Sequence, residues 1–293
     1  MKAKVTIGVC VRNGAATLPL AIESILHQDY PHELLEIIFV DDGSEDETLF
    51  IMKSYALKMD IQVKIFHHEW RGLGFTRNVV VNNATGDYIV WVDADMILPK
   101  DNIRKQVEFM NKNPGVGIAK AMYRLSSNGN LVALLEDVSC IIEDLQSGSN
   151  CAKLPGTGGT IYRTEAIRQI GGFDNSLVSV GEDQDAAYRI RASGWLIRMS
   201  DAYFFELRER SWSALWRKYF WYGSGNYFLY RKNKFIFKPY KMIPLVGFFV
   251  GLLYSFLAYR LIRRKVVFIL PLHFVFKSAA WFLGFISEFL KSI

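Results

Sequence analysis

The sequence predicts an α/β protein, with one domain built on a mostly parallel sheet and hydrophobic helices at its C-terminal end. Short apolar runs rich in β-branched residues alternate with segments of helical periodicity through the first half of the chain. Strands that alternate with helices form parallel sheets covered on both faces. The 293 residues are enough for one large domain with an appendage, and residues 242–293 are mostly apolar.

The order of the elements follows from these runs. Strands are expected at Val5–Val11, Leu35–Val40, Gln62–Phe66, Tyr88–Val92 and Gly117–Ala121. Helices are expected between them at Thr17–His27, Glu45–Met59, Gly74–Asn83 and Asn102–Asn113. Ligands of such sheets bind beyond the carboxyl ends of the strands, so the residues that follow each strand are the candidate site.

The formal net charge of +6 is unevenly distributed. Residues 231–293 contain eleven Lys and Arg side chains and one acid, Glu288, so this segment carries +10 and residues 1–230 carry −4. A nucleic-acid partner would explain a basic tail, but the apolar composition of this one fits a membrane better. We therefore predict a membrane partner and no nucleic acid.

Two apolar stretches make up most of this tail, at Met242–Tyr259 and Val266–Phe289. The first has eighteen residues and no charge, which is the lower limit for a spanning helix. The second contains Pro271, His273 and Lys277, which favours an interfacial or re-entrant position. Basic clusters flank the stretches, so a two-span hairpin would place one cluster outside, against the positive-inside rule. A tight hairpin and a pair of in-plane helices both stay open, with a buried helical pair in a soluble protein as a further alternative.

The cysteines and the N-terminus indicate the compartment. Cys10, Cys140 and Cys151 have no metal-binding spacing and no even count, which predicts reduced thiols. The apolar run near Met1 is too short for a signal peptide. We therefore expect a membrane-associated protein whose main domain faces the cytoplasm.

Polar residues follow three of the expected strands. Arg12-Asn13-Gly14 comes after the first, "DDGSEDET" (residues 41–48) after the second, and Asp93-Ala94-Asp95 after the fourth. If Asp93 ends its strand and Asp95 lies in the turn after it, the two carboxylates can converge on one cation, and a role in capping and turn formation is the alternative. Three polar ends at one edge of a sheet indicate a site.

The second of these ends can be interpreted residue by residue. Gly43 suits the turn and Ser44 a cap for the next helix, but capping does not require both Asp41 and Asp42. A carboxylate here can accept hydrogen bonds from a ribose or a base. The chain has no G-x-G-x-x-G and no P-loop, so phosphates would need a divalent metal. Further candidates for phosphate or base contacts are Arg71, Arg77 and Asn78 in "WRGLGFTRNVV". Ordinary surface polarity is the alternative interpretation of these residues.

A second acidic cluster lies in "VGEDQDAAYRIRASGW", residues 180–195. Glu182, Asp183 and Asp185 crowd the start of a helix after a turn at Gly181. Acids are favoured at a helix N-terminus by the helix dipole, so capping is the alternative. Three carboxylates exceed what capping requires, and one of them can serve as a general base toward a sugar hydroxyl.

The order "R-N-G … V-D-D-G-S … A-T-G-D-Y-I … D-A-D … G-G-F-D … G-E-D-x-D … R" resembles that of the family 2 glycosyltransferases over roughly residues 4–200. The resemblance implies a GT-A fold, a nucleotide-sugar donor linked to UDP or GDP, Mn²⁺ or Mg²⁺, and inversion at the anomeric centre by direct displacement. It implies that Asp42 lies by the nucleobase, that Asp93 and Asp95 hold ribose and metal, and that Asp183 is the general base. Glu182 and Asp185 then lie around the base. The predicted donor-binding residues are Cys10, Arg12, Asn13, Asp42, Arg71, Arg77, Asn78 and Asp93, and the predicted metal ligands are Asp93 and Asp95.

Departures from the family pattern reduce the number of reactions that the sequence allows. Polyprenyl-phosphate sugar synthases commonly have D-A-D-x-Q, but Ile97 stands at the Gln position here. Processive synthases carry Q-x-x-R-W, whereas residues 211–230 offer only an aromatic-rich segment that suits a membrane interface, sugar stacking or plain packing. Gly156–Gly159 either lets the backbone approach the donor sugar or forms a simple turn.

We therefore predict inverting transfer of one sugar to a hydroxyl acceptor, a lipid-linked saccharide or another surface-glycan precursor. The alternatives are a polyprenyl-phosphate glycosyl synthase, a nucleotidyltransferase, and a non-catalytic subunit that binds a nucleotide sugar. The expected domains are a catalytic domain at residues 1–210, an aromatic and basic juxtamembrane segment at 211–241, and membrane-associated helices at 242–293.

Overall fold

The computed structural model of the chain describes residues 3–126, 130–148, 151, 153–236 and 238–292. The chain divides into two compact units. The first contains Met1–Arg124, Ser147–Val178 and Glu182–Leu207, and the second contains Leu125–Gln146, Ser179–Gly181 and Arg208–Ile293. The expected boundaries at residues 210 and 241 stay predictions.

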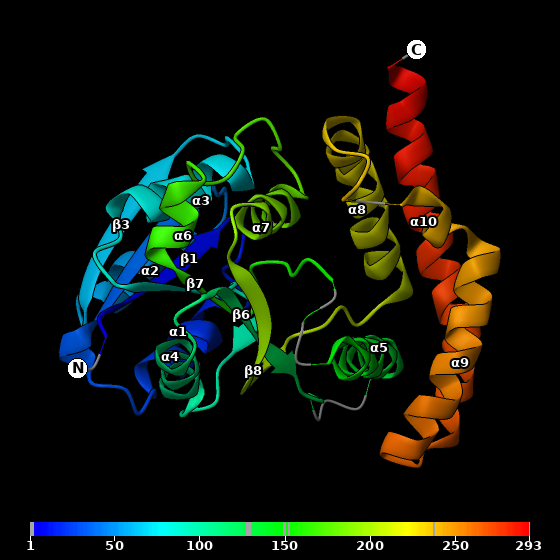
Figure 1. Cartoon of the computed structure of the whole chain (residues 1–293), viewed down its shortest axis with the longest axis horizontal. Helices are drawn as coiled ribbons and strands as arrows, with labels where there is room; N and C mark the ends of the chain where they lie inside the picture. The colour runs from blue at the N-terminus through cyan, green and yellow to red at the C-terminus, as the bar shows by residue number, and fades with distance from the viewer. Residues whose placement is uncertain (1–2, 127–129, 149–150, 152, 237, 293) are drawn as a thin grey trace. The chain divides into compact units, whose positions relative to one another are not determined.

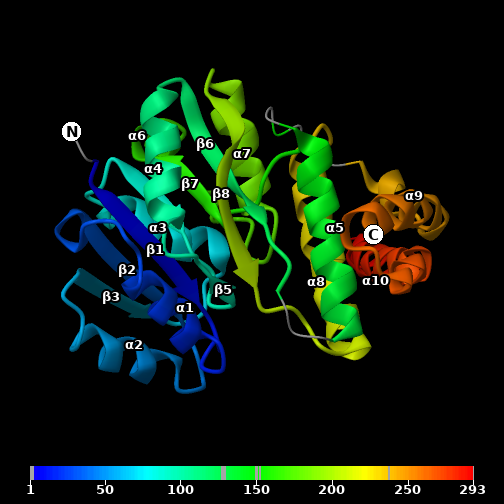
Figure 2. The same ribbon diagram turned by 90° about the horizontal axis from the view of Figure 1, so that it is seen from below.

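The first unit is built on one sheet with the strand order β3-β2-β1-β4-β7-β6-β8-β5 (Figure 2). Its strands are β1 Val5–Val11, β2 Leu35–Asp42, β3 Gln62–His68, β4 Tyr88–Trp91, β5 Met96–Ile97, β6 Val116–Tyr123, β7 Thr160–Arg163 and β8 Leu196–Glu206. The strands β3, β2, β1 and β4 are parallel, so their carboxyl ends meet at one edge. β7 runs antiparallel to both β4 and β6, while β8 is parallel to β6.

Helices cover both faces of this sheet (Figure 1). They are α1 Leu18–Leu26, α2 Thr48–Ala56, α3 Leu73–Asn83, α4 Asn102–Lys112, α6 Thr164–Gln169 and α7 Glu182–Ala192, with a short 3₁₀ turn at His32–Leu34. Successive strand residues point to opposite faces, so Ile7 and Ile37 pack with α1, α2 and α4. Ile38 and Trp91 pack on the other face with α3, α6 and α7. Two apolar cores therefore hold the sheet rigid and fix its carboxyl edge.

The expected strands and helices are present, with shifts at their ends. β1 has the expected bounds, and β2 and β3 each extend by two residues, which carries Asp41 and Asp42 into the strand. α2 begins at Thr48 after an N-cap residue Glu47. The expectation that Ser44 caps this helix is wrong, because its hydroxyl accepts the backbone N–H of Asn13 instead.

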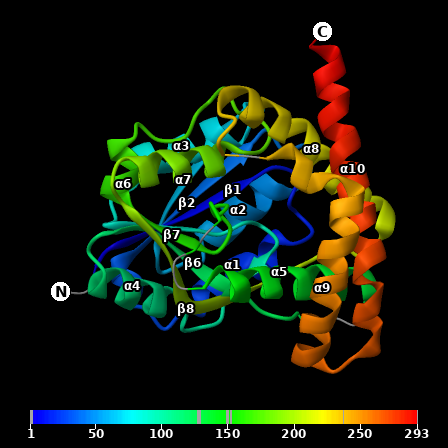
Figure 3. The ribbon, with the colours of Figure 1, turned by 45° about the vertical axis from the view of Figure 1, so that its right-hand side comes forward.

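The second unit is helical (Figure 3). It contains α5 Leu131–Ser147, α8 Trp212–Lys232, α9 Pro244–Ile262 and α10 Leu270–Lys291, with 3₁₀ turns at Pro239–Met242 and Lys265–Ile269. Glycines let α8 approach α10 closely, since a Cβ at Gly223 would lie 1.9 Å from the carbonyl oxygen of Trp281. The aromatic segment is thus helix α8, which sequence reasoning had not assigned, and α5 was likewise not expected.

Candidate active site

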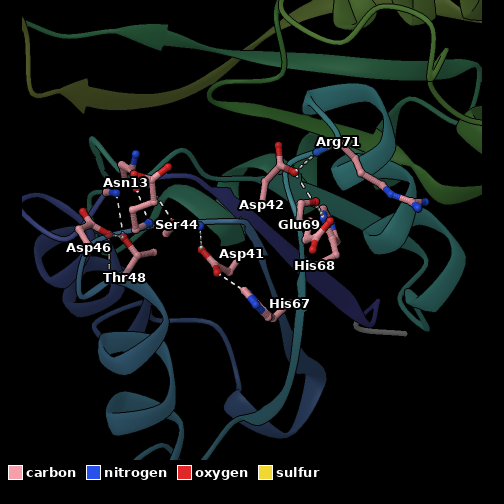
Figure 4. A network of polar contacts seen from close by, with 12 residues as sticks. Asn13, Asp41, Asp42, Ser44, Asp46, Thr48, His67, His68, Glu69 and Arg71 are labelled. Carbon is pink, nitrogen blue, oxygen red and sulfur yellow. Dashed lines mark hydrogen bonds and ion pairs between the residues drawn. The ribbon is translucent and has the colours of Figure 1, made fainter.

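The carboxyl ends of β2 and β3 place two acids opposite two histidines (Figure 4). Asp41 is fully buried, and its Oδ2 lies 2.7 Å from Nδ1 of His67. Asp42 accepts the backbone N–H groups of Arg71 at 2.7 Å and Gly72 at 3.0 Å. A carboxylate oxygen has two lone pairs, so these bonds leave Asp42 acceptor capacity while they fix the turn that leads into α3.

The loop after β1 is joined to the turn after β2. Asn13 has a positive φ of 51°, a conformation that Asn tolerates, and its Oδ1 accepts the backbone N–H of Glu45 at 2.8 Å. Arg12 lies 5.5 Å from the ring centroid of Trp70, and its Nη2 is 3.7 Å from Oε1 of Glu45. Three loops that follow β1, β2 and β3 therefore meet at the expected edge.

Arg77 connects the D-A-D turn to the G-E-D-x-D segment. This side chain from α3 is buried, and its Nη2 lies 3.9 Å from Oδ1 of Asp93. Its Nη1 forms an ion pair with Oε1 of Glu182, which is 1% exposed at the start of α7. The side chain of Asp93 is 44% exposed, so this carboxylate faces solvent on one side and the guanidinium on the other.

The glycine loop before β7 runs beside two of the predicted acids. A Cβ at Gly158 would lie 2.8 Å from Oδ2 of Asp93, and one at Gly156 would lie 3.1 Å from Oδ2 of Asp183. Glycine is therefore needed for the backbone to pass at this distance. The structure thus brings Asp93 and Asp183, ninety positions apart in the sequence, to one loop.

Two neutral groups lie in the same region, the partly buried Cys10 and the buried Tyr162. Burial raises the pKa of the Cys10 thiol to about 12; Arg77 opposes this, while Asp93 and Asp42 add to it. Burial also raises the pKa of Tyr162, and the charge of Asp183 raises it further.

The D-A-D segment forms a turn after β4. The backbone N–H of Met96 donates to the carbonyl of Asp93 at 3.0 Å, and the carbonyl of Asp95 accepts the N–H of Leu207 at 2.7 Å. β4 ends at Trp91, so Asp93 begins the turn and is not the last strand residue as expected. The turn is held at both ends, which fixes the direction of its carboxylates.

The D-A-D turn offers two carboxylates as candidate ligands of a divalent cation. Carboxylates are preferred ligands of Mg²⁺ and Mn²⁺, and such ions are often held by one or two carboxylates together with substrate phosphates. Within the described residues, no group of three or more His, Cys, Asp and Glu side chains is placed to hold a metal. Asp93 and Asp95 therefore suit an ion completed by a diphosphate.

Three other predicted residues have partners within the protein. The Asn78 amide bonds to the backbone N–H and carbonyl of Phe173, both at 2.8 Å. Asp185 accepts Nε of Arg189 at 2.8 Å, and Arg189 donates to the carbonyls of Ile170 and Gly172. Through these contacts Asn78 holds the G-G-F-D loop (residues 171–174) directly, and Asp185 holds it through Arg189. The guanidinium of Arg71 lies 4.7 Å from the ring centroid of Phe75.

Sequence reasoning missed several neighbours of the site. The register of β2 and β3 places Asp41 opposite His67. The two acids at the end of one strand and the two histidines at the end of the next could have suggested this pairing from the sequence. Tyr162 lies on β7, a strand that was not expected from the sequence, and nothing in its local sequence marks it as a neighbour of Asp183.

Comparison with known proteins decides the family. The model of the family described as Glycosyl transferase family 2 matches residues 6–169, and that of Glycosyl transferase family group 2 matches residues 88–287. The chain belongs to glycosyl transferase family 2. Membership of this family is what the resemblance in its sequence implied.

Solved structures confirm the predicted fold class of this glycosyltransferase. The mannosyltransferase PcManGT from Pyrobaculum calidifontis, in complex with GDP-Man and Mn²⁺, matches with a TM-score of 0.69 at 18% identity, over 100% of this chain and 89% of that one. Residues 1–349 of S. aureus TarS in complex with UDP match with a TM-score of 0.56 at 18% identity, over 99% and 92% of the chains.

Curated relatives match over shorter segments. An uncharacterized glycosyltransferase of Rickettsia conorii is 32% identical over 130 residues, which is 44% of this chain and 21% of that protein. The putative glycosyltransferase EpsE of Bacillus subtilis is 36% identical over 111 residues, or 38% of this chain and 39% of that protein. The aligned part of the glycosyltransferase thus spans between a fifth and two fifths of the length of these relatives.

Proposed function

We propose that the glycosyltransferase transfers one sugar, with inversion, from a UDP- or GDP-linked donor to a hydroxyl acceptor. The observation that carries this proposal is that the side chains of Asp93 and Asp183 both lie beside the glycine loop before β7, while Arg77 contacts both Asp93 and Glu182. Support comes from the structural neighbours, which are complexes with GDP-Man and Mn²⁺, with UDP and with UDP-GlcNAc.

The donor side of the site uses the edge formed by β1, β2 and β4. Asp42 accepts from the nucleobase or ribose, and Arg12 and Asn13 border the same edge. Asp93 and Asp95 would hold Mn²⁺ or Mg²⁺, which when bound neutralises the charge that develops on the leaving diphosphate. The guanidinium of buried Arg77 faces the carboxylate of Asp93 at 3.9 Å and would help to orient it.

The acceptor side uses Asp183. It lies in the first turn of α7, where acidic side chains are favoured because the N-terminus of a helix carries partial positive charge. Asp183 takes the proton from the acceptor hydroxyl as that oxygen attacks the anomeric carbon on the face opposite the diphosphate. The neighbouring Glu182 is neutralised by Arg77, so it does not compete for this proton.

The acceptor is a saccharide on a lipid carrier or another surface-glycan precursor, and the active site faces the cytoplasm. Two segments are long and apolar enough to cross a membrane, Pro244–Ile262 and Lys265–Lys291, which supports membrane association. Donors made in the cytoplasm and an acceptor held at a membrane would then meet at one site. A panel of UDP- and GDP-linked sugars, tested with membrane extracts, would identify the donor.

Asp183→Asn tests the mechanism. Loss of a general base typically costs about 10²–10⁴-fold in rate, so turnover should fall by at least about 100-fold while donor affinity stays near that of the wild type. Turnover is followed by release of nucleoside diphosphate, and donor affinity by calorimetry. Glu165→Gln is the matched control, since Glu165 is an exposed acid in the first turn of another helix, α6.

Other outcomes of this experiment favour the alternatives. Near-normal turnover of Asp183→Asn would indicate a phosphate acceptor, as in a polyprenyl-phosphate glycosyl synthase. Release of pyrophosphate in place of nucleoside diphosphate would indicate a nucleotidyltransferase. Donor binding without transfer or hydrolysis, unaffected by Asp95→Ala, would indicate a non-catalytic subunit.

A further inference from the structure

The outward side of α9 is a continuous apolar surface. No charged residue occurs from Pro244 to Tyr259. Large side chains are exposed along the helix, namely Leu245, Phe248, Phe249, Leu252, Leu253 and Phe256. Soluble proteins rarely expose apolar surface of this extent, and where they do it marks a contact with another protein or a membrane.

The opposite side of α9 is occupied by α10. A Cβ at Gly247 would lie 2.6 Å from Oγ of Ser278, and one at Gly251 would lie 2.6 Å from Cα of Pro271. One turn further on, the hydroxyl of Ser255 donates to the carbonyl of Val267 at 3.1 Å. Small residues at a spacing of four thus define the inner side of α9 and leave the large side chains on the outer side.

α10 is not a lone apolar helix, because α8 packs against it. Trp212 at the start of α8 lies 5.8 Å from the ring of His273, near the start of α10. Tyr227 near the end of α8 lies 5.4 Å from the ring of Phe285. The two helices therefore run in the same direction. α8 also carries four basic residues, Arg217, Lys218, Arg231 and Lys232.

α10 is also fixed to the polar helix α5. Glu136 of α5 is buried, and its Oε1 accepts from His273 Nε2 at 2.8 Å and Lys277 Nζ at 2.7 Å. Its Oε2 accepts from the hydroxyl of Tyr219 on α8 at 3.0 Å. α5 carries further acids at Asp137, Glu143 and Asp144. An α10 that crossed a bilayer would draw these charged helices into hydrocarbon, which is costly.

Basic residues lie at both ends of α9. Lys234 and Lys238 are exposed before it, and Arg260, Arg264 and Lys265 are exposed at or after its end. If α9 spanned the membrane, one of these clusters would lie on the outer side, against the positive-inside rule. In a helix parallel to the membrane, both clusters lie at the headgroups, where lysine and arginine attract anionic lipids.

We propose that α9 lies in the plane of one leaflet of an anionic membrane, with its outward side among the acyl chains, and that the chain does not cross the bilayer. This inference rests on the membrane association proposed above. It selects the in-plane arrangement from the two that the sequence leaves open. The layer of α8, α9 and α10 then presents one apolar side to lipid and retains its charged contacts with α5 outside the hydrocarbon.

Vesicle flotation tests the surface. The full chain should float with vesicles that contain phosphatidylglycerol and bind vesicles of phosphatidylcholine alone at least about tenfold more weakly, because basic residues contribute to the affinity. Phe249→Glu combined with Leu253→Glu should weaken binding by at least about tenfold. Phe50→Glu is the matched control, since Phe50 on α2 is 70% exposed and Phe249 is 61% exposed. Equal binding by both variants would overturn the proposed surface.

A protease-protection experiment tests the topology. A protease recognition sequence is inserted between Arg264 and Lys265 in one variant, and between Lys58 and Met59 of the first unit in another. In sealed membrane vesicles both sites should be cut from the same side. Protection of the site after Arg264, with cleavage of the site after Lys58, would show a spanning helix and overturn the inference. Donor hydrolysis is measured in parallel, so failure of the topology and failure of the proposed reaction are distinguished.

Discussion

Replacement of Arg77 by Met tests the connection between the two acidic motifs. Arg77 and Glu182 are both nearly inaccessible to solvent, so the variant leaves the Glu182 carboxylate buried without its cation. Breaking a buried pair in this way costs about 3–5 kcal/mol. Each kcal/mol lowers the melting temperature of a domain of this size by about 2–4 °C, so the expected loss is about 6–20 °C.

The assay is thermal unfolding of the purified protein in detergent, followed by circular dichroism. The double variant Arg77→Met/Glu182→Met should recover most of the lost stability, because two apolar side chains replace the pair. Neither variant should bind donor normally, since Asp93 has lost the guanidinium 3.9 Å away. Arg104→Met is the control: Arg104 pairs with Asp29 at 3.0 Å on the surface, and its loss should leave the midpoint nearly unchanged.

Two results would refute this reasoning. A single variant as stable as the wild type would mean that Arg77 does not neutralise Glu182. A double variant no more stable than the single one would mean that the loss comes from packing and not from an uncompensated charge.

Three further predictions concern the glycine loop, the Cys10 thiol and the α5 network. Gly158→Ala places a methyl group 2.8 Å from Oδ2 of Asp93 and should weaken metal-dependent donor binding at least about tenfold by calorimetry, whereas Gly115→Ala, whose Cβ would meet nothing nearer than 3.9 Å, should not. Because its pKa is raised to about 12, the Cys10 thiol stays protonated at pH 8 and should resist iodoacetamide in the folded protein but react in urea; mass spectrometry showing equal rates would contradict this. Burial would raise the pKa of Glu136, but its lysine and histidine partners hold it well below the ordinary 4.5, so its stabilising effect is present above about pH 4.5 and lost in stronger acid. The difference in melting temperature between wild type and Glu136→Gln should therefore shrink on acidification, and a difference independent of pH would contradict the assignment.

The parallel half of the sheet was predictable because three of its strands, β1, β2 and β4, are buried on both faces. A strand such as Val5–Val11 is then a short, nearly continuous apolar run bounded by polar residues. The acids follow such runs, so their common edge could be inferred before any contact was known. The links between them could not, because Arg77 looks like one of several polar residues at the start of α3, and its partner Glu182 lies far along the chain.

The elements that were not expected lack a clear local pattern. α5 places Glu136 and Asp137 in its buried middle, where acids normally indicate a solvent-exposed segment. They are buried because His273, Lys277 and Arg208 neutralise them, and these partners are distant in sequence. β8 is irregular, with register shifts against β6, and this obscures the alternation expected of a strand.

The most direct test of the proposed site is a thermal-shift titration of the full chain with UDP and GDP, with and without Mn²⁺. One nucleotide should raise the melting temperature only when Mn²⁺ is present, and Asp95→Asn should abolish this increment without lowering the melting temperature of the free protein. An equal increment in EDTA, or one that persists in Asp95→Asn, would contradict a cation held at residues 93–95 beside a donor diphosphate.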